Sequence, residues 1–204
     1  MKQNPKLNLN LNSFFIIIVI LLFSKVSFAQ QSNVVAGTME VGIARIDITP
    51  EGPIRLAGYG ARAKSESEEV LQRLNAKAMA FGSDVQHPSI LITVDLVGIP
   101  WRITEKLTEQ LSKKAGINPI QLVICASHTH GGPEVGNLLN ILQYRGDHFS
   151  DSLLELDQLT HIAQYTEQLS QKLEEVALAA LKNRKPAFVA WGQGQAGFAA
   201  NRRT

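Results

Sequence analysis

Short apolar runs and two longer helical repeats follow one another along this chain. Residues 89–94 and 120–126 are runs rich in Ile and Val, and such runs are typical of buried strands. Between them, residues 101–115 carry an apolar side chain at every fourth position with Lys and Glu in between, which predicts an amphipathic helix that ends at Gly116. A strand, a helix and a second strand in this order predict two parallel strands joined by a right-handed crossover.

Strand and helix patterns also flank this unit. Residues 39–50 alternate imperfectly between apolar and polar side chains, which predicts a strand that ends in a turn at Thr49-Pro50. Residues 74–81 have the composition of a helix, but the turn residues at 82–84 and the strand 89–94 follow at once, which favours a hairpin. A long helical pattern runs from 161 to 184, and Pro186 precedes a last strand at 187–191. The sequence therefore predicts an α/β fold, a mixed sheet with crossover helices.

The first 29 residues have the three parts of a secretory signal peptide. A polar start with Lys2 and Lys6 precedes an apolar core at 14–23, and small residues at Ser27 and Ala29 suit signal peptidase. The alternative is a membrane anchor, but a core of this length is too short to cross hydrocarbon about 30 Å thick. We therefore expect a secreted or periplasmic protein, with residues 30–38 as a flexible lead-in.

Charge and cysteine content narrow the classes of function. Without residues 1–29 the chain carries 17 basic and 18 acidic residues, a formal charge of −1, so binding to nucleic acid is not supported. Cys125 is the single cysteine, so no internal disulfide can form. Its place in the run 120–126 predicts a small buried core residue and not a nucleophile.

The candidate chemistry lies directly after that run. His128 and His130 are separated by one residue, and side chains so spaced point the same way in an extended chain, so both imidazoles are expected in one cavity. The glycines at 131–132 allow a sharp turn or a close approach, and Pro133 prevents further strand pairing. Imidazole is a common zinc ligand, so we interpret the pair as half of a zinc site; the alternative is that the histidines only hydrogen-bond the turn.

Other polar residues offer weaker candidates. Asp95 ends the strand 89–94 and is interpreted as a turn or cap residue, with a role as a metal partner as the alternative. The segment 134–150 is interpreted as a surface insertion, with a lid as the alternative, and Glu134 or His148 could complete a zinc site. His161, near the start of a helix, is expected at the surface or in a cap. The glycine-rich stretch 192–197 is not a dinucleotide-binding motif, because no helix and no acidic partner follow it.

Several motifs taken in order resemble the neutral or alkaline ceramidase family. They are Val41 to Pro50, Gly58-Tyr59-Gly60, Leu74 to Ala78, Thr93 to Leu96, Ala126-Ser127-His128-Thr129-His130-Gly131-Gly132-Pro133, and Asn201-Arg202. The resemblance implies a secreted or surface zinc amidase that hydrolyses the N-acyl bond of ceramide or a related lipid amide. It implies that His128 is a zinc ligand, that His130 is catalytic and contacts the reacting group, and that Arg202 binds substrate. It also leaves open a peripheral contact with a membrane.

The chain also departs from that family. In the family a second zinc histidine, a glutamate and a tyrosine follow the Asn-Arg element, and this chain has no sequence that corresponds to them. We therefore expect residues 39–204 to be the N-terminal part of a ceramidase-like domain, an incomplete catalytic domain. Two alternatives stay open: a non-catalytic periplasmic or secreted α/β module derived from the family, and a different metallohydrolase in which both His128 and His130 are ligands.

Overall fold

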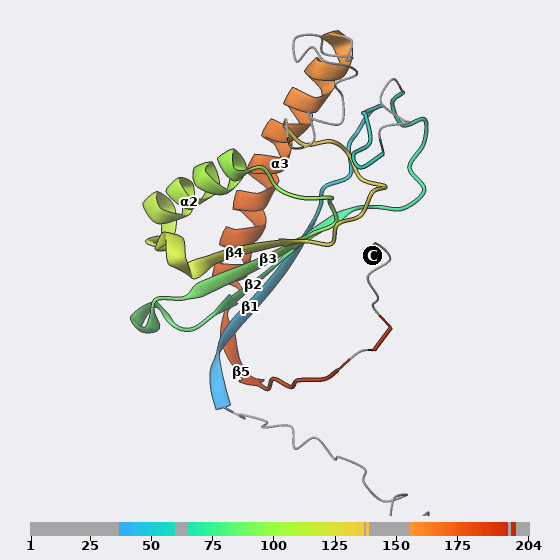
Figure 1. The fold of residues 1–204 in the computed structure, drawn as a ribbon. Helices are drawn as coiled ribbons and strands as arrows, with labels where there is room; N and C mark the ends of the chain where they lie inside the picture. Colours follow the sequence, from blue (N-terminus) through green and yellow to red (C-terminus); the bar gives the residue numbers. More distant parts are fainter. Residues whose placement is uncertain (1–36, 60–64, 137, 139–155, 196, 199–204) are drawn as a thin grey trace, which may run out of the picture. The chain divides into compact units, whose positions relative to one another are not determined.

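The computed structural model describes residues 37–59, 65–136, 138, 156–195 and 197–198 (Figure 1). Its contacts divide the chain into two units. The described residues of the first unit, at 190–195 and 197–198, form neither helix nor strand. The second unit, Ala36–Val189, contains all of the helices and strands described below. The predicted signal peptide and most of the lead-in lie outside the described residues.

The described part of the second unit forms a mixed sheet of five strands in the order β4-β3-β2-β1-β5. The strands are β1 (Gly37–Asp47), β2 (Asn75–Phe81), β3 (Ser89–Val94), β4 (Leu122–Ala126) and β5 (Lys185–Val189). β3 and β4 are parallel, whereas β1, β2 and β5 pair with their neighbours in antiparallel fashion. The α/β class, the 74–94 hairpin and the parallel crossover are confirmed. β1 begins two residues earlier than predicted, because Gly37 and Thr38 pair with β5.

Two α-helices connect these strands. α2 (Trp101–Ala115) links β3 to β4 and ends at Gly116, which has a left-handed backbone (φ 66°). The Gly116 amide donates to the Ser112 carbonyl and the Ile117 amide donates to the Leu111 carbonyl. α3 (Leu156–Lys182) begins five residues before the predicted start and leads to β5. Short 3₁₀ turns lie at η2 (Asp84–Gln86) and η3 (Pro119–Gln121). None of the helices within the described residues is long and apolar enough to cross a membrane.

The core lies on one face of the sheet, under both helices. Alternate strand residues are buried there together with one stripe of each helix, because successive side chains of a strand point to opposite faces. The buried strand residues are Gly42, Ala76, Ala78, Ala80, Ile90, Ile92 and Val94, and the half-buried Ala44 and Ile46 pack against the same core.

The other face of the sheet carries an apolar row. Strand register places Ile43, Met79, Leu91 and Val123 side by side across four strands. Ile43 is 61% exposed and Val123 is 52% exposed. The expectation of a buried strand at 120–126 is therefore wrong for β4, which forms an edge of the sheet. Cys125, expected in the core, is exposed because it lies on this face of the edge strand.

β5 forms the opposite edge of the sheet. The predicted order of strand, helix and strand is correct for β4, α3 and β5, but β5 pairs with β1 in antiparallel fashion and is not a neighbour of β4. Pro186 lies within β5 opposite Glu40, which an edge strand tolerates because its free side needs no amide donor.

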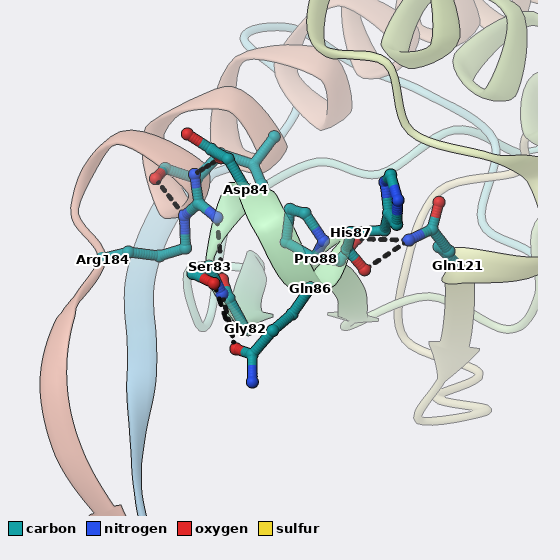
Figure 2. A network of polar contacts seen from close by, with 9 residues as sticks. Gly82, Ser83, Asp84, Gln86, His87, Pro88, Gln121 and Arg184 are labelled. Atoms are coloured by element: carbon teal, nitrogen blue, oxygen red, sulfur yellow. Dashed lines mark hydrogen bonds and ion pairs between the residues drawn. The ribbon is translucent and has the colours of Figure 1, made fainter.

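The β2–β3 hairpin turn is held on two sides by polar contacts (Figure 2). On one side the Arg184 guanidinium donates to the Gly82 carbonyl and to Asp84 Oδ1, at 2.8 and 2.6 Å. On the other side the Gln121 amide donates to the backbone carbonyls of His87 and Pro88. The turn is thus tied both to the segment between α3 and β5 and to η3.

Candidate functional site

The two histidines of the motif lie past the end of β4 with their rings in contact. Nε2 of His128 and Nε2 of His130 are 3.3 Å apart, and the ring centroids are 4.9 Å apart at an interplanar angle of 75°. β4 ends at Ala126, and His128 has a left-handed backbone (φ 61°). The prediction that the chain stays extended through the motif is therefore wrong. A turned backbone brings the two rings together instead.

A backbone carbonyl fixes the tautomer of His128. Its Nδ1 lies 2.8 Å from the carbonyl oxygen of Val97, and a carbonyl can only accept a hydrogen bond. Nδ1 must therefore carry the proton, which leaves the Nε2 lone pair of the neutral ring directed toward His130. Leu96 and Val97 are buried, so the loop that supplies this carbonyl is held by the core. A hydrogen bond from the far nitrogen of this kind is what orients metal-ligating histidines.

His130 is seated against a glycine from the β1–β2 connection. A Cβ atom built on Gly58 would lie 2.5 Å from Cγ of His130, so no other residue fits beside the ring without movement. Gly58 also has φ +99°, a conformation that favours glycine. The ring of Tyr59 meets that of His130 edge-on, at 4.9 Å between centroids and 66° between planes.

Backbone pairing joins the same connection to the residues after the histidines. The amide of Ala57 donates to the carbonyl of Gly132 at 2.9 Å, and that of Glu134 donates to the carbonyl of Arg55 at 2.8 Å. Side chains add a buried ion pair, in which Arg55 Nη1 lies 3.1 Å from Glu134 Oε2. The predicted close approach occurs at Gly132, where a Cβ would meet the Asp95 carbonyl at 3.3 Å.

The other predicted candidates do not join the histidine pair. Asp95 accepts a hydrogen bond from the Asn75 amide at 3.0 Å, so its carboxylate bonds the start of the neighbouring strand β2. Glu134, considered as a zinc ligand, is instead paired with Arg55. His161 lies in α3 and contacts Glu66 at 2.8 Å. Across the described ranges no group of three or more His, Cys, Asp or Glu side chains could hold a metal ion. His148, Arg202 and the segment 139–150 lie outside the described residues.

A pocket is lined in part by motif residues that alternate with the two histidines. It has a volume of about 330 Å³ and is lined by Thr129, Gly131 and Pro133, by residues between Thr49 and Leu56, and by residues between Ser67 and Leu74. His128 and His130 are not among its lining residues. The two imidazoles therefore contact each other but do not line this pocket.

Three residues that shape the site were missed in the sequence. Val97 and Gly58 contact the histidines, and Arg55 contacts Glu134, only because the fold brings distant parts of the chain together. The Gly58-Tyr59-Gly60 triplet predicts a bend in the backbone, because glycines flank an aromatic residue, but it does not predict a contact with His130. No local sequence pattern shows which distant side chain packs against a bend.

Comparison with known proteins shows that this chain is similar in fold to solved structures, without a match in sequence. No protein-family model matches the chain, and no curated protein matches its sequence. Two solved structures are similar: the neutral ceramidase from Pseudomonas aeruginosa, with a TM-score of 0.53 and 18% identity, and a ceramidase complexed with C2, with a TM-score of 0.51 and 19% identity. Each match covers 72% of this chain and 22% of the solved chain. The chain therefore shares the fold of part of these ceramidases.

Proposed function

We propose that this chain contributes the histidine pair of a ceramidase-like, zinc-dependent amidohydrolase that cleaves the N-acyl bond of a lipid amide. One observation carries the proposal: His128, its tautomer set by the Val97 carbonyl, directs Nε2 toward Nε2 of His130 at 3.3 Å. The fold that the chain shares with part of two ceramidases supports the same class of reaction. A secreted or periplasmic location is part of this proposal.

The donor set fits zinc as part of a site. Neutral imidazole nitrogen is a preferred zinc ligand, and the hydrogen bond between Nδ1 and the Val97 carbonyl leaves the lone pair of His128 on Nε2. His128 would hold the ion through Nε2. The remaining ligands would come from outside the described part of the chain. Bound zinc would polarise the amide carbonyl and lower the pKa of water.

The residues of this chain then have separable roles. The Val97 carbonyl keeps His128 in the tautomer that presents Nε2. Gly58 and Tyr59 hold the His130 ring beside it, where Nε2 of His130 can carry a proton for the departing amine. Arg202 is proposed, from its place in the Asn-Arg element, to bind the substrate.

A second candidate follows from the same distance. The 3.3 Å separation also suits a different metallohydrolase in which both imidazoles bind the ion. His130→Asn separates the two: zinc is retained with loss of amidase activity in the first candidate, and zinc affinity falls in the second.

The proposal is tested by His128→Asn against His87→Asn. Both histidines are exposed and both have a left-handed backbone, with φ 61° and φ 54°, which asparagine tolerates. We expect His128→Asn to weaken zinc binding at least tenfold and to abolish hydrolysis of an N-acyl lipid amide. His87→Asn should change neither. The measurements are zinc competition with a chelating dye and an amidase assay.

Absence of both zinc binding and amidase activity in the parent protein would overturn the proposal. That result would favour the non-catalytic α/β module. Equal zinc affinity in the parent and in His128→Asn would likewise remove His128 as a ligand.

A further inference from the structure

The buried Arg55–Glu134 ion pair stands apart from the residues proposed to react. Its two charged groups lie 3.1 Å apart, and the side chains are only 4% and 1% exposed. Arg55 belongs to the β1–β2 connection, and Glu134 follows the histidine motif. A buried ion pair adds little net stability, because desolvation of both charges offsets their attraction, but it strongly disfavours arrangements that separate the two charges.

The ion pair lies at one end of a short backbone pairing. Leu56 and Pro133 form an isolated antiparallel bridge, with hydrogen bonds from Glu134 to Arg55 and from Ala57 to Gly132 beside it. This pairing is too short to set its own register. The side chains of Arg55 and Glu134 meet directly at this end of the pairing.

Register decides what meets the imidazole of His130. With the observed register, Gly58 lies against the ring, and a single Cβ there would come within 2.5 Å of Cγ. A shift by one residue would place Ala57 or Tyr59 at this position, and either side chain would displace the ring. The contact between Tyr59 and His130 depends on the same register.

We propose that Arg55 and Glu134 are a positioning pair that keeps His130 in place beside His128. This inference rests on the proposed function for its catalytic consequence, but the geometric claim concerns the metal-free protein. Neither residue contacts the reacting group. Each acts through the backbone that seats the His130 ring.

The experiment uses Glu134→Gln, with Tyr165→Phe as a control that loses a buried hydrogen bond elsewhere in the core. The double variant Arg55→Met/Glu134→Leu removes both charges and remains informative if Glu134→Gln does not fold, because paired apolar replacement of a buried ion pair is commonly tolerated. The first readout is the ¹⁵N-histidine spectrum of the metal-free protein. The second is zinc affinity.

We expect the His130 imidazole signals to shift in both charge variants, while the His87 signals and the zinc affinity stay unchanged, because His128 and not His130 is the proposed ligand. Tyr165→Phe should leave the His130 signals and the zinc affinity as in the parent. Folded charge variants with parental His130 signals would overturn the positioning role. If the parent binds no zinc, the spectra alone decide, so failure of the proposed function is distinguishable from failure of this inference.

Discussion

Tyr165 joins the middle of α3 to the end of β1 through a single buried hydrogen bond. Its hydroxyl donates to the Ile48 carbonyl at 2.8 Å, and burial raises the pKa of Tyr165 well above its ordinary value. The hydroxyl therefore remains a donor throughout the neutral and mildly alkaline range.

Tyr165→Phe should lower the free energy of unfolding by about 1–3 kcal/mol, because the buried Ile48 carbonyl loses its side-chain donor while the ring still fills its space. Urea denaturation followed by circular dichroism measures the change. If Tyr165→Phe has the same urea midpoint as the parent, water satisfies the Ile48 carbonyl equally well.

Asp47 ties the end of β1 to the turn that follows. Its Oδ1 accepts from the Thr49 amide at 2.7 Å, and its Oδ2 lies 3.2 Å from an Arg73 guanidinium nitrogen. Hydrogen bonding from Thr49, through its side chain and then its backbone, lowers the pKa of Asp47, and the Arg73 charge adds to this.

A lowered pKa in the folded state gives Asp47 a defined effect of pH on stability. The contribution is complete above the ordinary aspartate pKa, about 4, and is lost as pH falls through the lower folded value, because the unfolded chain binds the proton first. Asp47→Asn should therefore be less stable than the parent at neutral pH and approach it in acid. Denaturant titrations at several pH values test this, and a difference independent of pH would contradict it.

Residue-scale features of the site were only partly predictable. His128 and His130 were identified because they are neighbours in the sequence and follow an apolar run. Their partners could not be identified, because Val97 and Gly58 are brought to them by the fold. The prediction that an extended chain brings the two imidazoles together was also wrong, because His128 has a left-handed backbone.

At the scale of elements, α3 lies directly against the backbone of β1. A Cβ on Gly42 would come within 1.9 Å of the Ala180 carbonyl oxygen and 2.7 Å of the Arg184 amide nitrogen. The Asn183 side chain bonds the Ile43 carbonyl at 3.1 Å at the same crossing. The missing side chain of Gly42 thus sets how closely helix and strand approach.

Gly42→Ala should destabilise the protein by about 3 kcal/mol or more, because the added methyl group meets backbone atoms that cannot rotate away. Gly37→Ala is the matched control in the same strand, since nothing lies within 4 Å of its added Cβ. Thermal denaturation should show a large loss for the first variant and almost none for the second. Equal melting temperatures of Gly42→Ala and Gly37→Ala would mean that α3 moves away from the added methyl group at little cost.

Elements with strong local signals were predicted well. The helix at 101–115 has a regular apolar stripe and a glycine stop, and its bounds are those of α2. The position of β4 at an edge was not predictable, because a run of Val and Ile looks alike in the centre and at the edge of a sheet. The order of strands depends on pairings between distant segments.

At the scale of the whole described unit, Ala36–Val189, the sheet separates two different surfaces. Both helices share one core beneath them, and two ion pairs, Lys106 with Glu167 and Lys114 with Glu174, connect α2 to α3. The opposite face has the row of apolar side chains from Ile43 to Val123. The histidine pair lies at the edge where the parallel strands β3 and β4 end, the usual place for ligands in α/β sheets.

The exposed position of Cys125 gives the folded protein a unique chemical handle. The thiol lies on β4 one residue from the strand's end, two residues before Ser127 and three before His128. A maleimide dye can therefore reach the native chain and mark a single spot close to the imidazoles. We expect the fluorescence of such a label to change when zinc binds at the histidine pair.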